Sequence, residues 1–247
     1  MTSFLGNNKG LVDFDQKSLA IAAASIAFNP IFWKTSALQH AKVRRVKKYH
    51  NKVLTKLAGG NSRYACYGLA VTIFSLGIFR DFLYERALRA QPSHPLLETD
   101  LAKYLAYALI AGGNTLVISS MWALGVTGTY LGDYFGILMD DMVTGFPFNI
   151  CGAPMYYGST MSFLGTALWF GKPAGVLLTA EVLIVYLLAL RFEDPFTGAI
   201  YAKRAQAQQK RPKKEFQSNS SNHRLYRLHN LLPSLYAVTL LQIPVIK

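Results

Sequence analysis

The chain has 247 residues, of which 51% are hydrophobic and only 16% are charged, and its formal net charge is +13. Soluble domains carry about 25% charged residues, so the composition excludes an ordinary soluble enzyme, and it is too hydrophobic for a largely disordered chain. High hydrophobicity with an excess of Lys and Arg is typical of a membrane protein with basic cytosolic loops. Nucleic acid is the other common partner of basic chains, but the long apolar segments exclude a DNA-binding domain.

The first apolar segment, 18–33, predicts a short intramembrane helix rather than a full span. A hydrocarbon core about 30 Å thick needs roughly 20 apolar residues in a helix, and this segment has 16. It also contains Asn29-Pro30, and a proline ring removes a backbone donor and breaks a helix. The next apolar segments, 64–83 and 103–126, are each long enough to cross a membrane.

The last long apolar region, 158–192, is too long for a single span. Gly171-Lys172-Pro173 divides it into segments 159–170 and 174–192, which we expect to form a helical hairpin with a short first arm. The predicted fold is therefore an all-α integral membrane protein. It is a small bundle of about four transmembrane helices with the short N-terminal intramembrane helix added.

Basic residues orient this bundle, because Lys and Arg near the ends of spans stay in the cytosol. Segment 34–63 carries nine basic residues and no acidic residue, and the tail 191–247 has a net charge of +7. The stretch 80–103 is neutral and the stretch 127–157 has a net charge of −3. We therefore expect 34–63, 127–157 and the tail to be cytosolic, and 85–102 to be luminal.

Two regions are predicted: a membrane-embedded domain over 1–204, and a basic tail over 205–247 with an apolar end. Basic patches beside a membrane attract anionic lipid head groups by about 1 kcal/mol per residue. We therefore expect contact with anionic lipids, and the alternative is that these residues serve only as a topology signal.

The most distinctive stretch is 123–160, which is rich in glycine and aromatic residues and contains no Lys or Arg. Glycine allows a ligand to approach the backbone, and aromatic faces attract cations. This stretch therefore suits a cationic small molecule at the membrane surface, and a packed interfacial loop with aromatic anchors is the alternative. The aromatic candidates for such a site are Tyr130, Tyr134, Tyr156 and Tyr157.

Polar groups in or beside the apolar segments are the other candidates. Adjacent carboxylates, Glu193 and Asp194, follow the last apolar helix and could accept hydrogen bonds from ribose hydroxyls. Glu181 lies inside that helix, where an ionisable residue is costly and usually functional. In the span 103–126, Ala111-Gly112-Gly113 and the polar Asn114 would allow close approach either of a ligand or of a neighbouring helix.

Soluble nucleotide enzymes and metallohydrolases have no support in the sequence. No phosphate-binding glycine loop, zinc-protease helix or serine-hydrolase elbow occurs. The five histidines form no cluster, and Cys66 and Cys151 have no metal-ligand spacing. We therefore expect no metal.

Several motifs together resemble the phospholipid N-methyltransferase family, over about residues 15–205. They are FNPIFW (28–33), LGDYFGILM (131–139), VTGFPFN (143–149), PMYYGST (154–160) and EDPFTGAIY (193–201). The resemblance implies S-adenosylmethionine (SAM) as methyl donor. It assigns cofactor binding to Ala111, Gly112, Gly113, Glu193 and Asp194. Ala111 replaces a usual glycine, and Asp194 replaces a usual glutamate.

The resemblance also implies an activity, the N-methylation of phosphatidylethanolamine-type lipids, including their mono- and dimethyl forms, to phosphatidylcholine. The endoplasmic reticulum membrane is the expected location, with a mitochondrial membrane as the alternative. An ammonium has no lone pair, so a base must first remove a proton. Glu181, Asp133 and Tyr134 are the candidates, and Tyr130, Tyr156 and Tyr157 are candidates for the substrate cage.

Two other functions remain open at this point. One is methylation of a different membrane acceptor such as a prenylcysteine carboxylate, which should need a basic pocket. The absence of Lys and Arg from 123–160 favours an amine acceptor. The other is a non-catalytic membrane protein that binds lipid.

Overall fold

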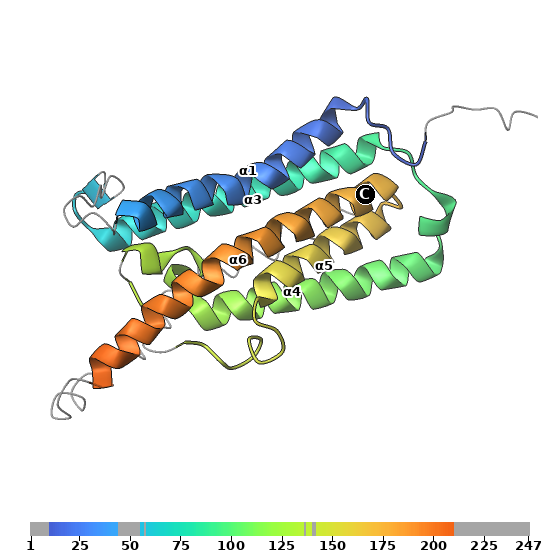
Figure 1. Ribbon diagram of the computed structural model, residues 1–247. Helices are drawn as coiled ribbons and strands as arrows, with labels where there is room; N and C mark the ends of the chain where they lie inside the picture. Colours follow the sequence, from blue (N-terminus) through green and yellow to red (C-terminus); the bar gives the residue numbers. More distant parts are fainter. Residues whose placement is uncertain (1–9, 44–54, 57, 136, 140–141, 210–247) are drawn as a thin grey trace, which may run out of the picture.

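A computed structural model describes residues 10–43, 55–56, 58–135, 137–139 and 142–209, and within these ranges the chain is helical with no strand (Figure 1). One layer holds two helices that run side by side, α1 (Lys17–Val43) and α3 (Ser62–Ala90). The other holds α4 (Asp100–Thr129), α5 (Pro154–Trp169) and α6 (Pro173–Gln209). Two short 3-10 helices, η1 (Pro95–Leu97) and η2 (Gly132–Phe135), lie in the connections. The predicted all-α fold is confirmed.

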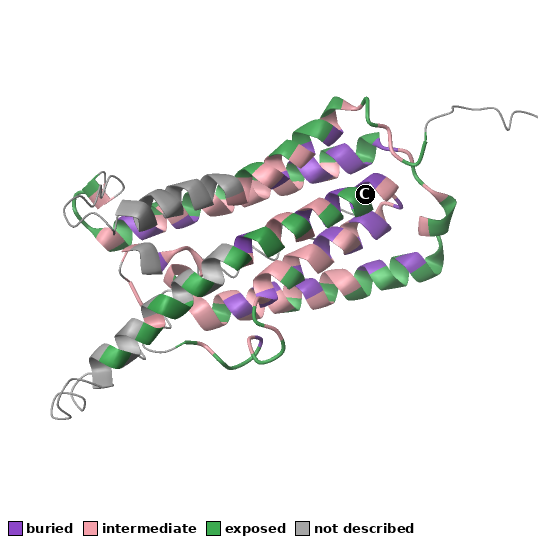
Figure 2. Cartoon of the chain, viewed as in Figure 1, coloured by how far each residue is buried: buried purple, intermediate pink, exposed green. Residues whose placement is uncertain are grey.

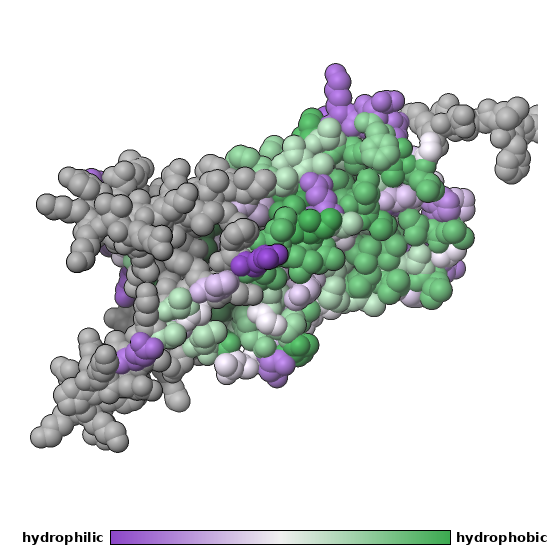
Figure 3. Space-filling view, viewed as in Figure 1, coloured by the Kyte–Doolittle hydropathy of each residue, from purple (hydrophilic) through white to green (hydrophobic). Residues whose placement is uncertain are grey.

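Three of these helices are long and apolar enough to cross a membrane: α3, α4 and the part of α6 over Pro173–Arg191. Apolar side chains cover most of the described face that Figure 3 presents, as expected for a surface in contact with lipid. The fourth helix of the expected bundle, α5, has 16 residues and is therefore only about 24 Å long. The predicted hairpin agrees with the α5–α6 pair, whose turn contains Gly171 at φ 65°.

Two helices are longer than the segments expected for them, 18–33 and 174–192, and each contains a proline. Pro30 lies within α1, which continues to Val43, so the N-terminal helix is longer than the segment 18–33. Pro195 lies within α6, which continues to Gln209. A proline removes only one backbone donor, and neighbouring helices make it tolerable in a membrane protein. Beyond Pro195 the sequence is also rich in Ala, Lys, Arg and Gln, which favour helix.

Helix α4 is irregular at one glycine, Gly125, and not at the Gly112-Gly113 pair. Gly112 and Gly113 lie in continuous helix, whereas Gly125 has φ 65° and ψ 178°, outside the helical region. Such a backbone conformation is available at little strain only to glycine. The helix is therefore interrupted near its C-terminal end, just before the connection that leads to η2.

Small residues bring α4 and α5 into close contact. A Cβ added to Gly113 would lie 2.5 Å from the carbonyl oxygen of Gly158, and one added to Gly158 would lie 2.6 Å from the carbonyl oxygen of Gly113. A Cβ on Gly165 would lie 2.7 Å from Cγ1 of Ile110. Helices in a membrane gain no hydrophobic driving force from one another, so this backbone approach supplies their packing energy.

The hydrophobic core lies where α1, α3, α5 and α6 face one another (Figure 2). Tyr84 of α3 is its polar centre: the hydroxyl contacts the carbonyl oxygens of Phe163 (2.9 Å) and Gly175 (3.2 Å), and Oγ1 of Thr179 lies 3.4 Å away. The core residues are Leu19, Ala22, Ile26, Tyr84, Ala87, Leu88, Phe163, Ala174, Leu178 and Val182.

The connections gather at two opposite ends of the bundle (Figure 1). At one end the amide of His94 donates to the carbonyl of Gly171, and the side chain of Gln91 bonds the backbone of Asp13 in both directions at 2.8 and 2.9 Å. At the other end lie the start of α3, the end of α4, the connection to α5 and the end of α6. This grouping is the one that the predicted orientation requires.

Candidate functional site

An aromatic pair forms where α5 begins beside α6. The rings of Tyr156 and Tyr186 have centroids 4.9 Å apart and an interplanar angle of 70°. Since Gly158 packs against Gly113, near the middle of α4, α5 begins partway along the bundle rather than at its end. Met139, in the connection that leads to α5, lies against the end of α4, where a Cβ on Gly128 would be 3.1 Å from its Sδ.

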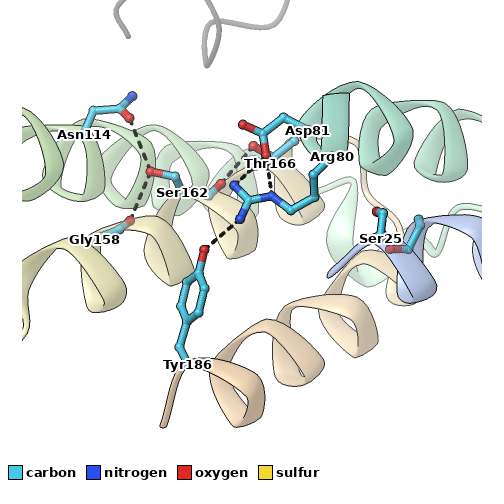
Figure 4. Close-up of polar contacts among 9 residues, drawn as sticks. Ser25, Arg80, Asp81, Asn114, Gly158, Ser162, Thr166 and Tyr186 are labelled. Atoms are coloured by element: carbon cyan, nitrogen blue, oxygen red, sulfur yellow. Dashed lines mark hydrogen bonds and ion pairs between the residues drawn. The ribbon is translucent and has the colours of Figure 1, made fainter. Parts of the chain in front are cut away.

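A largely buried arginine of α3 contacts one member of this pair, Tyr186 (Figure 4). Nη1 of Arg80 donates to the hydroxyl of Tyr186 at 2.8 Å, while Nε and Nη2 donate to Oδ1 of Asp81 at 3.0 and 2.8 Å. The guanidinium also lies over the ring of Phe163, 4.8 Å from its centroid. The structure thus joins one cation, one carboxylate and two tyrosines from α3, α5 and α6.

No motif in the sequence points to this cluster, although the sequence contains one signal of it. Arg80 lies four residues beyond Leu76, the middle residue of α3, which is about 6 Å along the helix axis. It is therefore inside the membrane-spanning part of the helix, where an ionisable residue is by default a functional candidate. The adjacent pair Arg80-Asp81 marked this position, but its partner Tyr186 is 106 residues away.

The predicted cofactor residues on α4 have different surroundings. Gly113 is buried against α5, and a Cβ on Gly112 would lie 3.2 Å from Cε of Met161. Ala111 is exposed. Of the two readings that the sequence left open for this segment, the geometry of Gly113 favours helix packing. The polar Asn114 accepts a hydrogen bond from the hydroxyl of Ser162 at 3.4 Å (Figure 4).

The predicted carboxylate pair lies on α6 beyond the aromatic pair. Glu193 is seven residues after Tyr186 in the same helix, which is about 10 Å further along the axis. The side chains of Glu193 and Asp194 lie outside the described residues, as do those of Asp133 and Tyr134 in η2. Their predicted contacts therefore stay predictions.

The third candidate base, Glu181, lies on a different face of α6. The face of the helix that carries Glu181 is exposed at Leu177, Ile184 and Leu188, which lie at helical spacing from it. The buried face carries Leu178 and Val182. The five residues from Glu181 to Tyr186 correspond to a rotation of about 140° around the helix. The geometry therefore does not turn Glu181 toward Tyr156.

Two further tyrosines of the predicted cage lie apart from the pair. Tyr130 follows the last residue of α4, and its carbonyl oxygen lies 3.6 Å from Sγ of Cys66. Burial raises the pKa of its phenol, which keeps this side chain neutral. Tyr157 is 40% exposed and, as the neighbour of Tyr156 in α5, points about 100° away from it. The described part of the chain contains no cluster of three or more potential metal ligands.

Comparison with known proteins gives a consistent result. The family model described as phospholipid methyltransferase matches residues 101–204. The phosphatidyl-N-methylethanolamine N-methyltransferase of Neurospora crassa is 66% identical over 193 residues, covering 78% of this chain and 86% of that protein. Its counterpart in Saccharomyces cerevisiae is 53% identical, covering 79% and 91%. The human phosphatidylethanolamine N-methyltransferase is 42% identical, covering 82% and 97%. No solved structure matches the chain.

Proposed function

We infer that this chain, which belongs to the phospholipid methyltransferase family, methylates the amine of phosphatidylethanolamine-type lipids, including their mono- and dimethyl forms, to give phosphatidylcholine. The observation that carries this inference is the extent of the similarity, which covers 86% to 97% of the relatives named above. The apolar helices support a lipid acceptor, because an enzyme embedded in the bilayer can receive its substrate sideways from it.

The chemistry of the residues fits SAM as the methyl donor, which supplies an electrophilic methyl group on a sulfonium. Aromatic faces such as those of Tyr156 and Tyr186 attract a sulfonium or an ammonium. We assign the carboxylates of Glu193 and Asp194 to the ribose hydroxyls or the amino group of the donor, since ionised carboxylates accept strong hydrogen bonds. Gly112 and Gly113 would contribute by letting α5 approach closely.

The residues of this chain then act mainly by positioning. Holding an amine and a methyl donor in line can supply up to about 7–11 kcal/mol of the barrier. A base must also accept the ammonium proton before attack, since the protonated amine has no lone pair. Because Glu181 is turned away from the aromatic pair, we favour Asp133 or Tyr134 of the segment before α5 for this role.

We further propose that the enzyme resides in the endoplasmic reticulum membrane, with 127–157 and the end of α6 in the cytosol. The net charges of the connections support this orientation, and SAM is a polar metabolite of that compartment. The basic segments would then face anionic lipid head groups.

A membrane assay with radiolabelled SAM tests the function. Purified protein in lipid vesicles is offered phosphatidylethanolamine, its monomethyl form, its dimethyl form, or a prenylcysteine. We expect label in one or more of the phospholipids and none in the prenylcysteine. Transfer to the prenylcysteine alone would assign a different acceptor, and no transfer to any of the four would contradict the proposal.

A further inference from the structure

Arg80 is a largely buried cation within the membrane-spanning part of α3. Its side chain is only 14% exposed, and that of its ion-pair partner Asp81 is 26% exposed. A charged residue at this depth is tolerated only when its charge is paired and its donors are satisfied. Asp81 pairs the charge from the same helix, and the bond from Nη1 to Tyr186 ties the guanidinium to α6.

The guanidinium is fixed on three sides. Asp81 accepts from Nε and Nη2, the ring of Phe163 lies beneath the guanidinium plane, and Nη1 remains to donate to Tyr186. The guanidinium is a rigid planar fork, so once two of these contacts are set, the direction of the Nη1 donor is set as well. Arg80 therefore fixes the position of the Tyr186 hydroxyl from a different helix.

Tyr186 transmits this constraint to Tyr156. Its ring lies edge-to-face against that of Tyr156, and a phenol whose hydroxyl is held has little freedom to swing its ring away from its partner. The contacts form one line: Arg80 to the hydroxyl of Tyr186, and the ring of Tyr186 to the ring of Tyr156. Two aromatic rings attract one cation together only when both lie within about 6 Å of it.

We propose that Arg80 is a positioning residue for the lipid amine, which holds the ring of Tyr186 against Tyr156 so that the aromatic pair receives the ammonium head group. This inference rests on the proposed function, because it assigns the aromatic pair to the acceptor. Arg80 itself touches neither substrate. A purely structural arginine would make the same contacts but would leave the affinity for the acceptor unchanged.

Two substitutions break the central bond in different ways. Tyr186→Phe keeps the ring against Tyr156 and removes the acceptor for Nη1. Arg80→Lys keeps the positive charge but cannot reproduce the fork geometry. In purified full-length protein at saturating SAM, each should raise the KM for the monomethyl lipid about fivefold to tenfold, the scale of a weakened cation–π contact. The KM for SAM and the kcat should change less than about twofold. A contact that binds the acceptor equally in the ground state and the transition state raises the acceptor KM when it is lost and leaves kcat unchanged.

The same helix provides matched controls. Arg89 also pairs with a carboxylate, Glu85 at 2.6 Å, and its guanidinium lies 5.1 Å from the ring centroid of Phe170. Arg89→Lys changes the same kind of contact without touching the aromatic pair and should leave both KM values unaltered. Tyr84→Phe removes another tyrosine hydroxyl that links α3 to α5 and α6. It should lower thermal stability without raising the KM for the acceptor.

A double substitution separates positioning from general damage. Because Arg80→Lys and Tyr186→Phe break one bond, the double variant should raise the acceptor KM no more than the larger single effect. If the rise in acceptor KM of the double variant is the product of the two single rises, the proposal is overturned. It is also overturned if the single variants lose kcat or stability while the acceptor KM is unchanged. If Arg80→Lys does not fold, Tyr186→Phe alone decides. An inactive parent enzyme would refute the proposed function instead, so the two failures are distinguishable.

Discussion

Gly113 in α4 and Gly158 in α5 lie so close that neither position has room for a side chain. A Cβ on Gly113 would lie 2.5 Å from the carbonyl oxygen of Gly158, and a Cβ on Gly158 would lie 2.6 Å from that of Gly113. Neither carbonyl can move without disturbing its own helix. The contact therefore fixes the depth at which α5 begins, and with it the level of Tyr156 two residues earlier.

Replacing Gly113 with alanine should destabilise the protein, since overpacking of this kind costs about 1–3 kcal/mol. Thermal unfolding in detergent measures the effect, and the specific activity of the remaining folded protein is measured in parallel. Gly77→Ala is the matched control: no atom lies within 4 Å of its added Cβ, and alanine favours helix by about 1 kcal/mol over glycine. A folded but inactive Gly113→Ala would instead indicate a cofactor contact at Gly113.

Glu193→Gln should abolish methyl transfer while leaving expression and membrane insertion intact. The substitution keeps the shape of the side chain and removes the charge that we assign to the methyl donor. Labelled SAM assays on equal amounts of purified protein provide the measurement, and Glu85→Gln, which changes an acid outside the site, is the control. Equal activity of Glu193→Gln and the parent would refute the site assignment.

Removing the hydroxyl of Tyr84 should lower the free energy of unfolding by about 1–3 kcal/mol, because buried carbonyl groups of Phe163 and Gly175 lose a donor. Thermal unfolding of Tyr84→Phe in detergent tests this. Tyr104→Phe on α4, where the side chain is 71% exposed, should have no measurable effect. A stable Tyr84→Phe would mean that these bonds contribute little.

The orientation predicts which cysteines an impermeant maleimide can reach in sealed microsomes. Cys151, and a cysteine introduced at exposed Gly198, should react from the cytosolic side. A cysteine at exposed Ser93, in a Cys151→Ser background, should react only after permeabilisation. Cys66 is fully buried and should stay unlabelled. Labelling of positions 151 and 198 from opposite sides would contradict the arrangement.

Local features of the fold were predictable from the sequence. The hairpin turn was predicted from Gly171 and Pro173. The structure has Gly171 at positive φ and Pro173 at the start of α6. The lengths of α1 and α6 were not predictable, because both helices continue past an internal proline, where packing and helix-favouring residues outweigh the loss of one hydrogen bond. Proline is a local signal, and these outcomes depend on the wider surroundings.

The candidate site was predictable only in part. Tyr156 stood out through its aromatic neighbours, but its partner Tyr186 lies within an apolar helix with no motif around it. The bond between Arg80 and Tyr186 joins residues 106 positions apart, and no periodicity within a single helix relates them. Only the packing of α3 against α5 and α6 brings this cluster together.

The length of α6 determines where the C-terminal tail begins. With 37 residues, the helix is about 55 Å long, far more than a hydrocarbon core of about 30 Å. The 18 residues that follow Arg191, up to Gln209, therefore form a stalk that leads about 27 Å from the apolar part of the helix. A reporter inserted directly after Gln209 should stand clear of the lipid head groups, which makes this position suitable for immobilising the protein without blocking lateral entry of substrate.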